Sequence, residues 1–243
     1  MNIKHATAFV TGANRGIGRA FVDGLLRAGA AKVYATARDI SKLADLSDDP
    51  RVVPVNLDIS KPEQIAVMAA KYDDVTLLIN NAGTAAFSGL IAANDIADAR
   101  DEMETNYFGT LNMIRAFAPV LAENAGGAIV NLASIASYVN FPVLGSYSAS
   151  KAAVHSLTQG VRAELNAQGT LVIGVYPGPV DTDMAATFPM DKTPPSDVVQ
   201  SVLNAVEAGL EDVYPDPVSV ELHAGILGNS KAVEREVGTM LPE

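Results

Sequence analysis

Short apolar runs alternate with amphipathic segments along most of the chain. The apolar runs have the length and near-continuous character of strands that are buried on both faces of a sheet; they cover residues 5–11, 32–37, 52–57, 75–80, 128–132 and 170–176. Between them, apolar positions recur with a helical period, in segments at residues 17–29, 62–71, 95–123, 147–166 and 196–210. This alternation predicts an α/β fold, a doubly wound parallel sheet with helices on both faces.

The C-terminal part has a weaker pattern. Val213 and Tyr214 favour a short edge strand, which the two following prolines limit because proline cannot donate a hydrogen bond to a sheet. Residues 231–238 favour a final helix. No repeat or linker divides the chain, so residues 1–243 are expected to form a single domain, with a substrate loop at about 180–195.

Composition and charge narrow the classes of function. The formal net charge is −11, which argues against nucleic acid or an anionic membrane as a partner because both attract basic surfaces. The chain has no cysteine, and its three histidines form no ligand motif, so neither thiol chemistry nor a metal site is expected. No apolar run is long enough to span a bilayer, and the first strand begins too early for a cleaved signal. We therefore expect a cytoplasmic protein.

A glycine-rich turn lies between the first strand and the first helix. It reads T-G-A-N-R-G-I-G and covers residues 11–18 inside a β-α-β unit, which is the context that a dinucleotide-binding turn requires. Glycines let the backbone approach a cofactor pyrophosphate, and the helix N-terminus favours its negative charge. The turn therefore predicts a nucleotide cofactor.

A tyrosine and a lysine four residues apart are the candidate catalytic pair. Tyr147 and Lys151, in Y-S-A-S-K, would point the same way from one helix, a turn apart. A free tyrosine has a pKa near ~10, so it transfers protons poorly at neutral pH. A nearby ammonium stabilises the phenolate, and we expect Lys151 to lower the pKa of Tyr147. Ser146 is a candidate cap for this helix.

Taken in order, the motifs from Thr11 to about Thr182 resemble the short-chain dehydrogenase/reductase family. The resemblance implies a Rossmann-type fold, an oxidoreductase activity on C=O or CH-OH groups, and four catalytic residues, Asn106, Ser134, Tyr147 and Lys151. It also implies a cofactor site formed by Gly12, Asn14, Arg15, Gly16, Ile17, Gly18, Arg38, Asp58, Asn80, Ala82, Gly83, Tyr147, Lys151, Pro177, Gly178, Val180 and Thr182. In hydride transfer the carbonyl oxygen gains negative charge, so it needs donors and then a proton. Ser134 and Tyr147 can supply them.

The end of the second strand bears on the choice of cofactor. Enzymes that use NAD place an acid there for the ribose 2′-OH, whereas an arginine suits the 2′-phosphate of NADP. Here Ala37 stands at the acid's expected position and Arg38 follows it, with Arg15 as a second candidate and Asp39 as a contrary signal. The pair Arg15 and Arg38 resembles the NADP-preferring carbonyl reductases of the family, so NADP(H) is expected.

The expected partner is a small apolar carbonyl compound or alcohol, because residues 135–145 and the substrate loop, with Met184, Phe188 and Met190, are rich in apolar side chains. An imine reductase, or a catalytically silent NADP-binding regulator, would share the same scaffold. A homodimer or homotetramer is also expected, since family members pair through the two helices that here carry Ala116, Ala152 and Val161.

Overall fold

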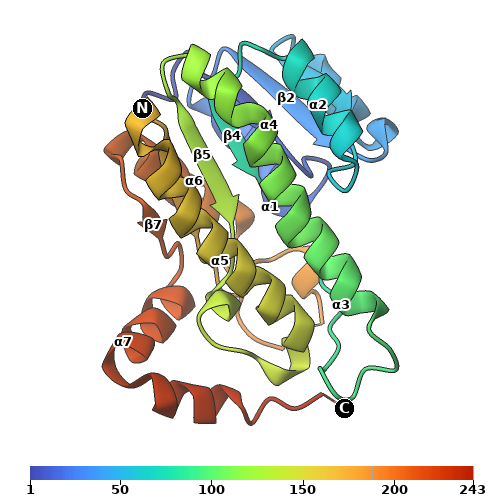
Figure 1. Cartoon of the computed structure of the whole chain (residues 1–243), viewed down its shortest axis with the longest axis vertical. Helices are drawn as coiled ribbons and strands as arrows, with labels where there is room; N and C mark the ends of the chain where they lie inside the picture. Colours follow the sequence, from blue (N-terminus) through green and yellow to red (C-terminus); the bar gives the residue numbers. More distant parts are fainter. Residues whose placement is uncertain (188, 243) are drawn as a thin grey trace.

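The computed structural model describes residues 1–187 and 189–242. Within them, seven parallel strands form one sheet in the order β3-β2-β1-β4-β5-β6-β7, a Rossmann-type arrangement (Figure 1). The strands are β1 (Thr7–Val10), β2 (Lys32–Ala37), β3 (Val52–Asn56), β4 (Leu77–Asn80), β5 (Ala128–Leu132), β6 (Leu171–Val175) and β7 (Asp212–Val213). The strand order reverses between β1 and β4, and ligands of such sheets bind beyond the strand ends at this point. The predicted fold class is confirmed.

Helices cover both faces of the sheet. One face carries α1 (Gly16–Arg27) and α6 (Pro195–Ala208), and the other carries α2 (Pro62–Lys71), α4 (Thr110–Glu123) and α5 (Gly145–Leu165). Successive residues of β1 point to opposite faces of the sheet, because side chains alternate along a strand. Val10 packs with the α1 and α6 residues, whereas Phe9 packs with those of α2, α4 and α5. No helix among the described residues is long and apolar enough to cross a membrane.

The long helix expected at residues 95–123 contains a change of winding. It begins as α3 (Ala97–Glu102), continues as a π-helical segment η2 (Met103–Gly109) and ends as α4. A π segment inside an α-helix inserts extra backbone and redirects its side chains, and such segments are frequent at functional sites. Asn106 lies in this segment.

Short 3₁₀ segments complete the connections: η1 (Ile40–Asp48), η3 (Ile135–Ser137), η4 (Pro142–Leu144), η5 (Asn166–Gln168) and η6 (Asp183–Ala185). The helix of Tyr147 begins at Gly145, and its N-cap position is Leu144, with no side-chain cap. The expected capping role of Ser146 is therefore wrong; its side chain is buried in the first turn.

The C-terminal helix is longer than the predicted segment at residues 231–238, so the predicted extent is wrong. Helix α7 runs from Pro217 to Val237 and bends at Asn229, whose backbone is not helical. Proline at the first helical position starts a helix readily, because the N–H that it lacks would have no partner there. In Figure 1, α7 lies beyond the carboxyl ends of the strands and leads into a tail that runs below α5.

Candidate active site

A cavity of about 1610 Å³ lies beyond the carboxyl ends of the strands. The glycine-rich turn, the ends of β2, β4 and β5, the first turns of α5 and the helix α7 all contribute to its lining. It therefore lies at the place where a doubly wound sheet binds its ligand.

The glycine-rich turn forms one end of this cavity, and the residues predicted there all line it: Gly12, Asn14, Arg15, Gly16, Ile17 and Gly18. A side chain at Gly18 would overlap the carbonyl oxygen of Gly12 and come within 2.5 Å of Asn81 Nδ2. Helix α1 begins at Gly16, so its first N–H groups have no partner within the helix. The turn thus has the close backbone approach and the exposed donors that a pyrophosphate requires.

The four predicted catalytic residues come from three separate elements that meet at the cavity. Ser134 follows β5, Tyr147 and Lys151 lie on α5, and all three line the cavity. Asn106, which is 1% exposed, lies behind them in η2. The fold therefore brings together the group that the sequence motifs predict.

The pKa of Tyr147 does not shift in the predicted direction. Burial raises the pKa of the phenol to about 12; a hydrogen bond with Ser134 opposes this rise, and the charge of Glu102 adds to it. The prediction that Lys151 lowers this pKa is therefore wrong for the protein without its cofactor. Tyr147 is therefore protonated at neutral pH, the state in which its hydroxyl can donate a hydrogen bond.

Lys151 is 5% exposed, and burial lowers the pKa of its ammonium group to about 8. Its Nζ donates to the carbonyl oxygen of Leu132, at 2.7 Å, and lies 5.7 Å from the centre of the Tyr147 ring. The lysine thus lies between the end of β5 and the tyrosine, and is still mostly charged at neutral pH.

Asn106 fixes the loop that follows β4. Its Oδ1 accepts from the backbone N–H of Thr84, and its Nδ2 donates to the carbonyl oxygen of Thr84, both at 2.9 Å. The same Nδ2 also donates to Ser150 Oγ, at 2.9 Å, which connects η2 to α5. One turn earlier, the buried Glu102 accepts from the N–H of Ala86, at 2.8 Å.

A group of basic and acidic side chains lines the cavity near the end of β2. Arg38, Asp39 and Asp58 line it, together with Lys42, which the sequence reasoning missed. Burial opposes ionisation of Asp58, but hydrogen bonds from Ser60 and the charge of Arg38 hold its pKa below the usual value. Asp39 accepts hydrogen bonds from the N–H and the hydroxyl of Ser41. The acid that spoke against NADP in the sequence therefore caps η1.

The segment after β6 contacts the glycine-rich turn at Arg15 and Gly16. Arg15 forms an exposed ion pair with Asp183, at 3.2 Å. A side chain at Gly16 would lie 3.1 Å from Thr182 Cγ2. Four of the predicted residues of this segment line the cavity: Pro177, Gly178, Val180 and Thr182.

Asn80 does not lie where the resemblance predicted. It is buried at the end of β4 and donates to Asn131, its partner in the register of β5, at 2.9 Å. Its neighbour Asn81 lines the cavity with Ala82 and Gly83, and donates to the carbonyl oxygens of Thr11 and Gly12. The doubled asparagine in N-N-A-G is the signal that points to Asn81, since successive residues face opposite ways at a strand end.

Comparison with known proteins gives the family. Residues 6–193 match the family model described as short chain dehydrogenase. An uncharacterised oxidoreductase of Staphylococcus aureus is 35% identical over 211 residues, which cover 82% of this chain and 90% of that protein. The chain belongs to the short-chain dehydrogenase family.

Two solved structures show which cofactors similar short-chain dehydrogenases bind. One from Burkholderia cenocepacia, in complex with NADP, is 45% identical, with a TM-score of 0.94, and covers 98% of this chain and 99% of that chain. One from Burkholderia phymatum, in complex with NAD, is 25% identical, with a TM-score of 0.83, and covers 93% and 96%.

The remaining walls of the short-chain dehydrogenase cavity are largely apolar. Residues of the two predicted segments line it, among them Ile135, Phe141, Met184 and Met190. Phe188, predicted here as well, lies outside the described residues. The sequence reasoning missed the contribution of α7 and its tail, which supply Val218, Leu222, Val237 and Met240. The helical spacing of these residues could have predicted this wall, but Pro215 and Pro217 made the start of the helix hard to place from the sequence.

Proposed function

We propose that this protein is an NADPH-dependent reductase that converts a ketone or an aldehyde to an alcohol, and that oxidises the alcohol in the reverse direction. The observation that carries the proposal is that Ser134, Tyr147 and Lys151 line the same cavity as the glycine-rich turn. The hydroxyl groups of Ser134 and Tyr147 line the cavity in which the cofactor would bind, so both can donate to the same substrate oxygen.

The charge around the cradle supports NADP(H) as the cofactor. Arg38 lines the cavity beside Ala37, whose methyl group offers no acceptor to a ribose 2′-OH. An arginine presents a planar fork of donors that suits phosphate oxygens. The 45% identical relative that binds NADP supports the same choice.

The residues of the chain divide the work of the reaction. Bound NADPH would supply the hydride. Ser134 Oγ would donate to the carbonyl oxygen and stabilise its growing charge, while Tyr147 would donate and then transfer its proton. Lys151, still largely protonated at neutral pH, would bind the cofactor ribose and favour loss of the tyrosine proton. Asn106 would hold α5 and the loop after β4 in place for this chemistry.

The test is NADPH oxidation with a panel of ketones, aldehydes and cyclic imines of increasing size. Turnover of apolar ketones or aldehydes is expected, because the substrate walls are mainly apolar. Turnover of imines alone would replace the proposal with an imine reductase. Tight NADPH binding without turnover of any compound would favour a silent regulatory protein.

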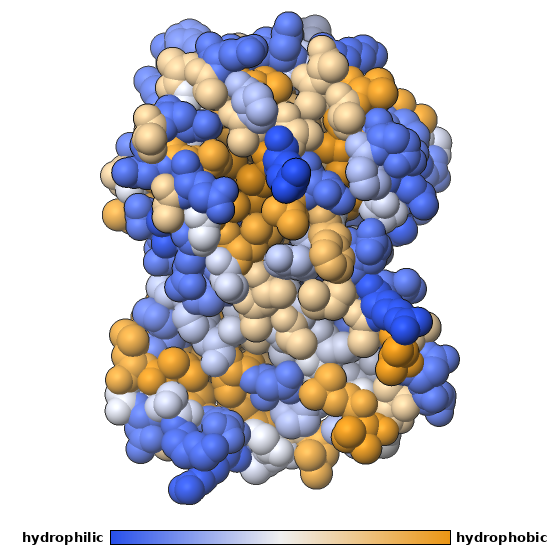
Figure 2. Space-filling model, viewed as in Figure 1, coloured by the Kyte–Doolittle hydropathy of each residue, from blue (hydrophilic) through white to orange (hydrophobic). Residues whose placement is uncertain are grey.

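The outer surfaces of η2 and α5 support a proposed homodimer or homotetramer, and we propose that the protein is cytoplasmic. Ala152 on α5 is half-buried, Phe108 in η2 is 45% exposed, and Figure 2 shows apolar residues gathered on one face of the molecule. Ala116, by contrast, packs against the protein's own core. Val161, expected to face outward, is buried against the protein's own sheet and takes no part in the proposed contact. Light scattering at micromolar concentration tests this assembly, and a monomer would contradict it.

A further inference from the structure

Helix α7 forms one wall of the cavity, next to the apolar residues that are proposed to contact the substrate. A single carboxylate, that of Asp216, attaches the first turn of α7 to the loop that follows β6. Asp216, the N-cap of α7, is 4% exposed. Its Oδ1 accepts from the N–H of Ser219 inside α7, at 2.8 Å. Its Oδ2 accepts from the N–H of Gly178, also at 2.8 Å, in the loop that follows β6. Both oxygens are therefore engaged, one by the first turn of α7 and the other by the loop that follows β6.

Gly178 is held so close to α7 that a side chain at this position would push Asp216 out of place. A Cβ at Gly178 would lie 2.8 Å from Asp216 Oδ1 and 3.2 Å from Val218 Cβ. The first of these distances is shorter than any normal contact between a carbon and an oxygen that are not bonded. The glycine of the P-G motif thus serves the docking of α7 as well as the cofactor loop.

The same loop is connected to the catalytic serine. The N–H of Ile135, next to Ser134, donates to the carbonyl oxygen of Pro177, at 3.1 Å. A movement of residues 177–178 is therefore transmitted in two directions, toward Ser134 and toward α7. Buried hydrogen bonds of this kind resist separation because neither partner would find water.

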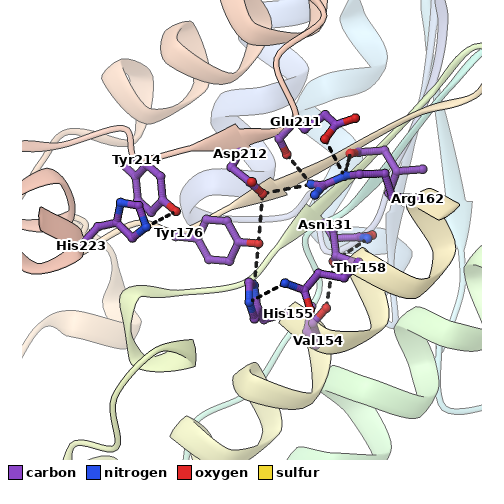
Figure 3. Close-up of polar contacts among 12 residues, drawn as sticks. Asn131, Val154, His155, Thr158, Arg162, Tyr176, Glu211, Asp212, Tyr214 and His223 are labelled. Carbon is purple, nitrogen blue, oxygen red and sulfur yellow. Dashed lines mark hydrogen bonds and ion pairs between the residues drawn. The ribbon is translucent and has the colours of Figure 1, made fainter. Parts of the chain in front are cut away.

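An aromatic cluster keeps the rest of α7 in register with this junction. Tyr214 Oη lies 2.8 Å from Tyr138 Oη and 2.9 Å from His223 Nε2, and the Tyr214 and His223 rings stack with their centres 4.0 Å apart. Figure 3 shows Tyr214 and His223 side by side, and Tyr176 directed toward His155 and Asp212. The fold thus brings together two histidines that the sequence left separate. It anchors α7 on the end of the sheet, so a shift of its first turn is carried along the helix.

We propose that Asp216 is a positioning residue that makes the substrate wall α7 respond to occupation of the cofactor loop. The inference rests on the proposed function in one respect, namely that the bound dinucleotide contacts residues 177–178. When that loop is ordered, the N–H of Gly178 holds the Asp216 carboxylate, and the carboxylate holds the first turn of α7. Cofactor binding would then complete the substrate wall before the substrate enters.

Hydrogen–deuterium exchange, with and without NADP⁺, tests this coupling without requiring a substrate. In the wild-type protein, NADP⁺ is expected to slow exchange in peptides that cover residues 217–225 by about ten- to a hundredfold, the range for one charge-assisted hydrogen bond. In Asp216→Ser, whose hydroxyl still caps the helix but does not reach Gly178, this slowing should disappear. In this variant NADP⁺ should still slow exchange in peptides that cover the glycine-rich turn, residues 11–18, which would show that the cofactor is bound.

Two further variants keep the test decisive. Ser219→Ala removes the reciprocal half of the capping box but keeps both acceptor oxygens of Asp216, so its α7 should exchange faster overall and still respond to NADP⁺. Asp216→Asn keeps a strong helix cap, with only one oxygen for two N–H donors, and should reduce the response if the serine variant fails to fold. An equal response of α7 in the wild type and in the folded Asp216 variants, or no response in the wild type, overturns the coupling. Failure of NADP⁺ and NAD⁺ to bind at all would instead refute the proposed function, and the inference with it.

Discussion

The Nζ atom of Lys151 lies 2.7 Å from the backbone carbonyl oxygen of Leu132, at the end of β5 and two residues before Ser134. This contact holds the ammonium group at a fixed distance from the Tyr147 ring, 5.7 Å from its centre. Burial lowers the pKa of the lysine and raises that of the tyrosine. Burial therefore favours the neutral form of both groups, and this has measurable consequences.

The affinity for NADPH should depend on pH through Lys151. The pKa of its ammonium group is about 8, so its positive charge is present below pH 8 and is lost above it. Because NADPH is an anion, its dissociation constant should rise by about tenfold or more between pH 7 and pH 9.5. Fluorescence titration measures this directly. Lys151→Met should bind weakly with a flat profile, and a pH dependence that survives in this variant would assign the effect to other groups.

Removal of the tyrosine hydroxyl should abolish chemistry without removing the cofactor site. Tyr147→Phe keeps the ring and loses the proton donor, so turnover should fall by at least ~10²-fold, the usual scale for general acid catalysis. NADPH affinity should change little, since the glycine cradle is intact. Single-turnover kinetics with the best ketone of the panel provide the measurement. Near-normal turnover would remove Tyr147 from the mechanism.

Glu102 should control the pH dependence of alcohol oxidation, in which Tyr147 must first lose its proton. The charge of Glu102 raises the pKa of Tyr147, so Glu102→Gln should lower this pKa and move the oxidation profile to lower pH. The glutamine can still accept from the N–H of Ala86, which keeps the loop in place. Asp98→Asn, an exposed acid on the same helix, is the matched control and should leave the profile unchanged. Identical profiles for all three proteins would contradict this role.

Discrimination between the two cofactors should depend on the end of β2. Arg38→Ala should weaken NADPH use by about ten- to a hundredfold with little effect on NADH, since a charge-assisted hydrogen bond contributes about 1.5–3 kcal/mol. Ala37→Asp should go further and favour NADH, because it repels the 2′-phosphate and accepts from the 2′-OH. Steady-state kinetics with both cofactors decide the matter. An equal loss with both in Arg38→Ala would make Arg38 structural and leave Arg15 as the phosphate ligand.

The sequence by itself determined the α/β architecture, the glycine-rich turn and the placing of Tyr147 and Lys151 one turn apart on a helix. Each depends on a local pattern: apolar runs of strand length, a glycine turn between a strand and a helix, and a tyrosine and a lysine one helical turn apart. Parallel strands linked by right-handed crossovers leave few ways to assemble such elements. The ends of these strands therefore had to meet at one edge, with Ser134 and Tyr147 beside the cofactor turn.

Only the tertiary structure decided the features that depend on contacts between distant segments. The upward direction of the Tyr147 pKa shift follows from burial and from the charge of Glu102, which is far away in the sequence. The placement of Asn80 depends on its pairing with Asn131 across the sheet. Helix α7 lines the cavity, and its N-cap Asp216 accepts from the N–H of Gly178, which is far away in the sequence. Burial and long-range hydrogen bonds exist only once the chain is packed, so no local pattern of residues encodes them.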